Sequence, residues 1–281
     1  MLINTGAYVF RLKTKQQQIL SIIDTLYGDV TTETEAVDFQ ISIRSTSFLR
    51  RFIKPQVSFY CDQHTPFKPL PANQAYPLFE WGMNWCIATH DHTRLLIHAA
   101  VLVKNGQAII FPAAPGSGKS TLTAYHSLSG WSLYSDEMAI IDLETGLVEP
   151  LYRPICLKND SIDLVKSWFP NPIFTPTWRD TQKGDVAHLK AKSWSEHQDL
   201  QPVPISAIVF PKYTKGHDLS IYQLTQLQGF ESLSKNAFNY SVLGKAGFYA
   251  VDKLIRQSKL FEIKYSNLQE VDAFLTEDVL L

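Results

Sequence analysis

The stretch over residues 111–121, FPAAPGSGKST, constrains this chain more than any other. The apolar run that ends at Phe111 predicts a strand, and a helix is expected to begin at about Gly118. Gly116 and Gly118 carry no side chain, so the backbone N–H groups there can close on the oxygens of an anion. The N-terminus of the following helix adds unpaired N–H donors and a partial positive charge. The sequence therefore predicts a phosphate-binding loop.

Two polar residues of this loop fit the chemistry of a nucleotide site. Lys119 would reach the β- and γ-phosphates, and the Ser120 hydroxyl would ligate Mg²⁺. The usual pattern begins with Gly, and Ala113 stands at that position, which the loop tolerates if this residue needs no positive φ. The alternative is a glycine-rich strand-to-helix turn with an idle lysine. The expected nucleotide-binding residues are Ala114, Pro115, Gly116, Ser117, Gly118, Lys119, Ser120 and Thr121.

A predicted β-hairpin precedes the loop and brings a histidine beside it. A strand over residues 94–103, an Asn-Gly turn at 105–106 and a return strand over 107–111 form this hairpin. Pairing outward from a two-residue turn places His98 level with Ala113. His98 is therefore expected beside the γ-phosphate end of the site. The alternative is a hydrogen-bonded core histidine.

Two adjacent carboxylates, Asp136 and Glu137, follow the strand predicted over residues 132–134. In phosphoryl transfer, one acidic residue at such a position holds Mg²⁺ and a second accepts the proton of the nucleophile. Neighbouring side chains of an extended strand point to opposite faces, so both acids reach one site only if the backbone bends there. We expect Ser120 and Asp136 as metal ligands and leave open which acid is the base. The alternative is an exposed turn pair.

Basic residues between positions 143 and 205 are candidates for the rim of the anion site. They are Arg153, Lys158, Lys183, His188 and Lys190. Arg153 and Lys158 are expected to contact phosphate or substrate, although each such residue alone is more often part of a solvated surface. The whole segment is predicted to be loop-rich. Its prolines make residues 170–178 a rigid excursion and a candidate substrate-facing flap.

The remaining segments are predicted to pack around this site. Prolines near residue 70 mark a candidate boundary between an N-terminal α+β part, residues 1–70, and a core, residues 71–281. The periodicity of apolar residues predicts helices near 14–27, 73–89, 225–240, 242–258 and 267–275. Further strands are predicted at 37–43, 207–210 and 219–223, the second of them central in its sheet.

Composition excludes several classes of protein. The chain has 281 residues, of which 45% are hydrophobic and 19% are charged, as in a globular protein of one or two domains. Its net charge of −1 gives no electrostatic reason to expect a nucleic-acid or membrane partner. Cys61, Cys86 and Cys156 are far apart in the sequence and fit neither a disulfide framework nor a zinc site. The N-terminus lacks a signal-peptide pattern, so the expected location is the cytoplasm.

In their order along the chain, these motifs resemble the HPr kinase/phosphorylase family, in particular its HPr-kinase-related branch of bacterial proteins. Members have a histidine followed by a small residue, a Gly-Lys-Ser loop and a paired acidic motif. These match His98-Ala99, residues 118–120 and Asp136-Glu137, and the resemblance covers residues 90–190. It implies an α/β P-loop kinase fold shared with phosphoenolpyruvate carboxykinase. This fold is a mixed, twisted sheet flanked by helices, here with a smaller N-terminal α+β part.

The resemblance also implies a function. It is that of an ATP- and Mg²⁺-dependent kinase that transfers the γ-phosphoryl group to a hydroxyl, foremost a serine of a protein or peptide. In the family the histidine contacts the transferred phosphate, and the acidic pair handles Mg²⁺ and proton removal. Glu137 stands where HPr kinases carry a second Asp, and their Glu-Arg-Gly type signature is not evident. These departures leave open HPr recognition, hexameric or other homo-oligomeric assembly, and reverse phosphorolysis.

Two other functions remain open from the sequence. One is a small-molecule kinase with the same site, and the other is a nucleotide-sensing regulatory module that binds ATP without turnover. The phosphoryl donor is also open between ATP, GTP and pyrophosphate, because the loop contacts only the phosphate chain.

Overall fold

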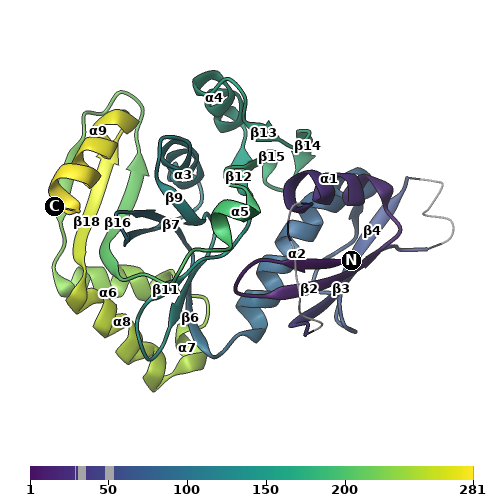
Figure 1. Cartoon of the computed structure of the whole chain (residues 1–281), viewed down its shortest axis with the longest axis horizontal. Helices are drawn as coiled ribbons and strands as arrows, with labels where there is room; N and C mark the ends of the chain where they lie inside the picture. The colour runs from purple at the N-terminus through teal and green to yellow at the C-terminus, as the bar shows by residue number, and fades with distance from the viewer. Residues whose placement is uncertain (29, 31–35, 48–53, 281) are drawn as a thin grey trace.

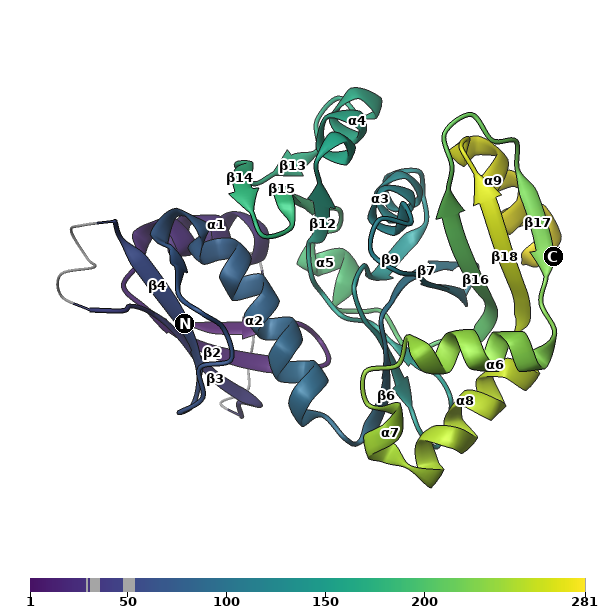
Figure 2. The same cartoon turned by 180° about the vertical axis from the view of Figure 1, so that it is seen from behind.

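The computed structural model describes residues 1–28, 30, 36–47 and 54–280 of the chain. It is a mixed α/β structure that contains several sheets and helices (Figures 1 and 2). The N-terminal sheet lies at one end of the molecule and the largest sheet at the other (Figure 1). Smaller sheets lie between them.

The N-terminal part is a sheet covered by two helices. Its strands are ordered β1-β2-β3-β4-β5, and they span Leu2–Asn4, Val9–Thr14, Phe39–Ser45, Gln56–Cys61 and Leu70–Pro71. Helices α1 (Gln17–Tyr27) and α2 (Ala75–His90) bury their apolar faces against this sheet in one hydrophobic cluster. The predicted helices near 14–27 and 73–89 and the strand near 37–43 are thereby confirmed. The helix that follows the candidate boundary near residue 70 packs with residues that precede it.

The largest sheet has the strand order β17-β18-β16-β8-β7-β9. These strands span Ser220–Gln223, Lys259–Tyr265, Ile205–Tyr213, Gln107–Pro112, Ala99–Lys104 and Ser132–Ser135. The neighbours β18, β16 and β8 are parallel, whereas the outer pairs are antiparallel. Strand β16 is central, as its apolar sequence predicted, and the hairpin of β7 and β8 has the predicted pairing of Lys104 with Gln107.

Helices cover both faces of this sheet. Along β8, Ile109 and Phe111 belong to one hydrophobic cluster and Ala108 and Ile110 to another, because successive side chains alternate between faces. The first cluster includes residues of α3 (Lys119–Leu128) and α9 (Leu268–Phe274). The second includes residues of α6 (Gln226–Lys235) and α8 (Lys245–Gln257). Short helix α7 (Tyr240–Leu243) and a π-helical turn, η3 (Leu275–Val279), complete the C-terminal region.

Two smaller sheets connect the N-terminal part to the largest sheet. One has the order β11-β10-β6, and its strands span Val148–Glu149, Ala139–Asp142 and Arg94–Ile97. The other is built on β15 (Gly184–Lys190), which pairs with β12 (Ile155–Lys158), β13 (Ile173–Phe174) and β14 (Trp178–Thr181). Helix α4 (Asp160–Trp168) follows β12 of the second sheet in the chain, and helix α5 (Trp194–His197) follows β15.

Three sequence-based predictions differ from this structure. The segment 143–205 was expected to be loop-rich, and besides its loops it contains the sheet built on β15, which was not predicted. That strand, with the sequence GDVAHLK, has weak intrinsic strand character, and its three pairing partners determine its conformation. The candidate flap at 170–178 is tied to this sheet, since Ile173 pairs with Lys190. Strand β18 was not predicted, because its lysines and glutamate obscure the apolar pattern.

The third difference is a break in the strand predicted over residues 94–103. The chain leaves the hairpin at His98, where the backbone N–H donates a 2.7 Å hydrogen bond to the Asn236 carbonyl. Strand β6, which comes just before His98, pairs with β10 in a separate sheet. As for the membrane, none of the helices in the described part of the chain is both long and apolar enough to cross a bilayer.

Candidate functional site

The loop after β8 has the backbone conformation that its glycines allow. Gly116 and Gly118 have φ angles of +85° and +88°, in the region that residues with a side chain rarely adopt. A Cβ on Gly118 would lie 2.8 Å from the Cβ of Tyr213 and 2.9 Å from the Tyr265 hydroxyl, so the chain passes close to β16 and β18 there. Ala113 is not among the residues of positive φ, and the substitution for Gly is therefore tolerated.

Two side chains at the start of α3 meet Asp136. The Lys119 ammonium donates a hydrogen bond to the backbone carbonyl of Asp136, and its Nζ lies 3.9 Å from Oδ1 of the same residue. The Ser120 hydroxyl donates a 3.0 Å hydrogen bond to Asp136 Oδ2. Lys119 and Asp136 are both buried, with exposed fractions of 7% and 1%. Strand β9 delivers the acid to the helix N-terminus because β9 lies beside β7 at the edge of the same sheet.

The Asp136 carboxylate is oriented by the neighbouring sheet. Its Oδ2 also accepts a 3.2 Å hydrogen bond from the backbone N–H of Cys156 on β12. Its Oδ1 is buried and has no hydrogen-bond partner among the described residues. Carboxylate and hydroxyl oxygens are ligands that Mg²⁺ prefers, usually together with phosphate oxygens and water. Asp136 and Ser120 therefore fit one flank of a Mg²⁺ site. The described residues contain no group of three or more His, Cys, Asp or Glu that would hold a metal alone.

His98 lies at the end of the hairpin next to the acidic pair. The pairing of β7 with β8 continues to Ala99 opposite Pro112, one position short of His98. The His98 Nδ1–H donates a 3.0 Å hydrogen bond to the Glu137 carbonyl, because a carbonyl oxygen can only accept. Burial and the nearby Lys119 charge lower the pKa of His98, so the ring is neutral at pH 7. Its Nε2 then carries a lone pair.

Cations surround Glu137. Burial tends to raise the pKa of this carboxyl, but Lys119, Lys158, His98 and Lys183 together hold it well below its usual value. The Glu137 side chain is half-buried and ionised. It can serve as a proton acceptor only when a bound anion offsets the charge of the surrounding cations. Asp136 and Glu137 lie between β9 and β10, where the strand has ended. The backbone therefore bends between the two strands, as it must if two adjacent acids are to reach one site.

The structure gives Arg153 partners other than the predicted phosphate. Its guanidinium donates to both the side-chain carboxylate and the backbone carbonyl of Glu80, and it donates a 3.0 Å hydrogen bond to Asn84 Oδ1. Glu80 also accepts hydrogen bonds from the hydroxyls of Tyr27 and Tyr76. Arg153 is therefore the centre of a buried ion pair between α2 and the segment before β12. Lys158 lies near Glu137, as its effect on the pKa of that carboxyl indicates.

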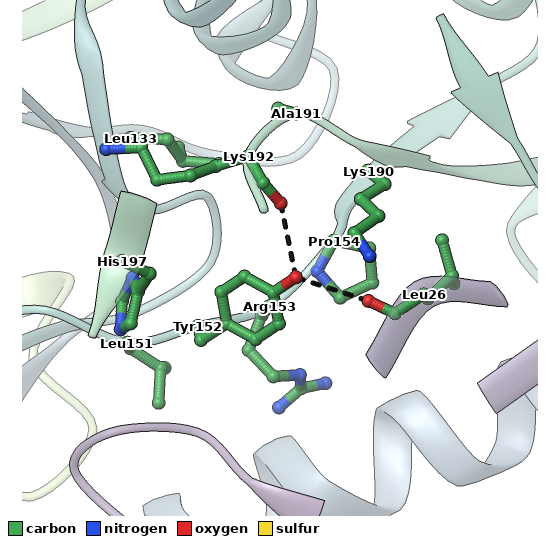
Figure 3. A pocket seen from close by; sticks show the side chains of 10 residues that line it. All are labelled: Leu26, Leu133, Leu151, Tyr152, Arg153, Pro154, Lys190, Ala191, Lys192 and His197. Atoms are coloured by element: carbon green, nitrogen blue, oxygen red, sulfur yellow. Dashed lines mark hydrogen bonds between the residues drawn. The ribbon is translucent and has the colours of Figure 1, made fainter. Parts of the chain in front are cut away.

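Three spaces border these residues. A groove of about 540 Å³ runs along the outside of the loop, between residues 112–117 and the ends of β16 and α6, where Tyr213, Lys235 and Asn236 line it. A small cavity lies beside Asp136 and Glu137 and is considered below. Figure 3 shows another small cavity, in which the Tyr152 hydroxyl donates to the carbonyls of Leu26 and Lys192. No loop residue lines this last cavity, and we assign it no phosphate chemistry.

Sequence reasoning missed the contribution of α2 to the site. Trp81 and Asn84 line the cavity beside Asp136, yet their spacing on an apolar helix indicated only core packing. Lys183 had been named as one of several rim candidates, and its Nζ lies 4.8 Å above the Trp81 ring. No local pattern connects these residues, since they meet only through the packing of separate sheets.

Comparison with known proteins identifies no relative: no protein-family model matches the chain, and a search of curated proteins finds no match.

Proposed function

We propose that this chain is a phosphotransferase that uses ATP and Mg²⁺ and transfers the γ-phosphoryl group to a hydroxyl. The observation that carries the proposal is the meeting of Lys119, Ser120 and Asp136 at the N-terminus of α3. A glycine-shaped loop, a lysine, a hydroxyl and a carboxylate are the elements by which proteins bind a nucleotide triphosphate with its metal. We further propose that the core is a P-loop kinase fold of the HPr kinase and phosphoenolpyruvate carboxykinase type.

In this proposal each side chain has a separate task. The backbone N–H groups of residues 114–121, apart from Pro115, which has none, and the Lys119 ammonium would bind the phosphates, and Ser120 with Asp136 would hold Mg²⁺, which neutralises phosphate charge when bound. The acceptor oxygen forms a bond to the γ-phosphorus while the bond to the bridging oxygen breaks and ADP leaves. The acceptor proton passes to Glu137 or Asp136. The neutral His98 lies beside the transferred group, and the groove along the loop offers about 540 Å³ for the nucleoside.

The sequence favours a serine of a protein or peptide as acceptor, with a small molecule as the second candidate. A nucleotide-sensing module that binds without turnover remains the alternative from another class. The Asp136-Glu137 pair favours turnover over sensing, because binding alone needs no second carboxylate at the γ-phosphate.

The test measures binding and turnover separately on the full chain. ATP affinity with Mg²⁺ is measured by calorimetry, and ATP consumption is measured with and without a fractionated bacterial lysate. The wild type is expected to bind ATP and to consume it when an acceptor is present, and Lys119→Ala is expected to abolish consumption with an unchanged circular dichroism spectrum. Ordinary consumption by the variant contradicts the site, and tight binding without consumption in any fraction supports the sensing module.

A further inference from the structure

A small cavity beside the acidic pair is formed by segments from different parts of the chain. Helix α2 forms one wall, the residues after β9 form the second, and strands β12 and β15 form the third. The residues that matter here are Trp81, Asn84, Asp136, Glu137, Cys156 and His188. The cavity therefore opens directly onto the two carboxylates that the proposed function uses.

Several polar atoms of these residues are buried without a partner. They are Nε1 of Trp81, both ring nitrogens of His188 and Oδ1 of Asp136, considering the residues that the structure describes. The His188 side chain is 1% exposed, and its ring packs edge-on against both Tyr76 and Trp178, with centroids at 5.2 and 5.8 Å. The ring is thus held in place with its hydrogen-bonding groups unused. Leaving such groups unsatisfied is unfavourable, because each has lost its hydrogen bonds to water, so a polar occupant is expected.

The size of the cavity limits that occupant. Its volume of about 20 Å³ admits one water-sized group. A hydroxyl enters such a space, whereas an aromatic ring does not. Because α2 and β15 enclose the cavity on two sides, a serine on the surface of a folded protein has no open approach along those sides.

Positive charge lies at the edge of this space. Lys183 lies over the Trp81 ring, and neither Lys158 nor Lys183 forms an ion pair with an acidic side chain among the described residues. Lys158 follows Cys156 by two positions on β12, so the two side chains leave the strand on the same face, toward the cavity that Cys156 lines. A ligand that places an anionic group here would balance the excess charge.

We propose that this cavity receives the hydroxyl of the phosphoryl acceptor, and that the acceptor is a small hydroxycarboxylate whose carboxylate lies against Lys158 and Lys183. This inference rests on the proposed function and selects its acceptor. Trp81 and His188 hydrogen-bond the hydroxyl end, and Glu137 lies beside it to take the proton as the oxygen bonds to the γ-phosphorus. A water molecule occupies the same space in the absence of acceptor.

The experiment uses matched probes that differ only in the anionic group. Glycerate is compared with glycerol, and L-serine with ethanolamine, with a mixture of uncharged serine-containing peptides as a further arm. ATP consumption is followed with each probe, and ³¹P NMR detects the new phosphate ester. At least one hydroxycarboxylate is expected to accelerate ATP consumption about tenfold or more over its counterpart without a carboxylate, the size of one well-formed charged contact.

Variants then locate the acceptor. Trp81→Phe, His188→Phe and Lys183→Met are expected to raise the KM for that hydroxycarboxylate about tenfold and to leave the Kd for ATP within about threefold. Lys245→Met is the matched control, since Lys245 makes a similar cation–ring contact with Tyr249 on α8, at 5.6 Å. Circular dichroism confirms that each variant is folded.

The outcomes separate the two proposals. Phosphorylation of the peptides with none of the hydroxycarboxylates, equal activity of the probes that lack a carboxylate, or bound ATP with no response to any probe overturns the acceptor assignment while nucleotide binding stands. An equal loss of ATP affinity in the cavity variants also overturns it, since these residues would then serve the donor. A wild-type chain that does not bind ATP removes the proposed function itself.

Discussion

The hydroxyl of Ser120 donates a 3.0 Å hydrogen bond to Oδ2 of Asp136, although 16 positions separate the two residues. Ser120 is in the first turn of α3, and Asp136 directly follows β9. The contact closes the loop, helix and strand into one unit, because the backbone N–H of Cys156 fixes the same carboxylate oxygen from the other side. A carboxylate held in this way keeps its second oxygen available for a cation.

Replacing Ser120 tests this arrangement. Ser120→Ala removes one oxygen from the expected Mg²⁺ site, so the Mg²⁺ concentration for half-maximal ATP consumption should rise about fivefold, equivalent to roughly 1 kcal/mol. Ser120→Thr retains the hydroxyl and should stay close to the wild type. Ser127→Ala on the same helix is the control, since the Ser127 hydroxyl donates to the Ala124 carbonyl and to no other group in the described part of the chain. A Mg²⁺ dependence that is equal in all variants would exclude Ser120 from the metal site.

Gly118 and Gly116 should differ in their tolerance of a side chain. Both have positive φ, which costs an alanine about 1 kcal/mol, but only Gly118 is also crowded, by Tyr213 and Tyr265. Gly118→Ala should therefore lower both the melting temperature and the ATP affinity more than Gly116→Ala. Thermal unfolding and calorimetry on the two variants measure this difference. Equal effects would mean that backbone conformation alone, and not the contact with β16 and β18, shapes the loop.

Local sequence patterns predicted part of the arrangement around the loop. The Asn-Gly turn set the pairing of β7 with β8, which ends at Ala99 opposite Pro112, and His98 lies just outside this pairing. The glycines of the loop and the acids after β9 are likewise local signals, because turn chemistry and strand ends are determined by neighbouring residues. The contact of Lys119 with Asp136 follows once β9 lies next to β7.

Contacts between separate sheets could not be predicted in this way. Arg153 was expected to bind phosphate because it is a basic residue near an anion site. Nothing in the neighbouring sequence indicates which acidic side chain such a residue pairs with. Its partner, Glu80, is 73 positions away on a helix whose apolar residues gave no indication of a buried charge. Strand β15 was missed for the same reason, since its conformation depends on three pairing partners more than on its own residues.

The pair of Arg153 and Glu80 should govern stability. Arg153→Met leaves the buried Glu80 carboxylate without its cation and is expected to lower the free energy of unfolding by about 3–5 kcal/mol. The double variant with Glu80→Leu should recover part of this loss, because no buried charge then remains unpaired. Urea unfolding measures both effects. A large change in ATP affinity with unchanged stability would instead restore the phosphate contact that the sequence suggested.

His98 should matter for turnover more than for nucleotide binding. Its ring contacts Glu137 and lies at the end of the hairpin, outside the loop whose N–H groups are proposed to bind the phosphates. His98→Ala is therefore expected to lower kcat about tenfold or more and to change the Kd for ATP less than about threefold. Steady-state kinetics and calorimetry provide the two values. An equal loss in both would make His98 a structural residue.

The stability of the chain should fall in mild acid because of His188. Burial lowers the pKa of this histidine from 6.5 to about 4, so the folded chain holds the neutral ring where the unfolded chain binds a proton. The unfolded state therefore binds more protons between pH 6.5 and pH 4, and the contribution is complete above pH 6.5 and lost as the pH falls toward 4. The loss is at most about 3 kcal/mol.

His188→Gln should flatten the dependence of the free energy of unfolding on pH over this range, whereas His92→Gln, at an exposed histidine, should leave its slope as in the wild type. Parallel curves for the wild type and His188→Gln would show that the buried ring takes up its proton without unfolding.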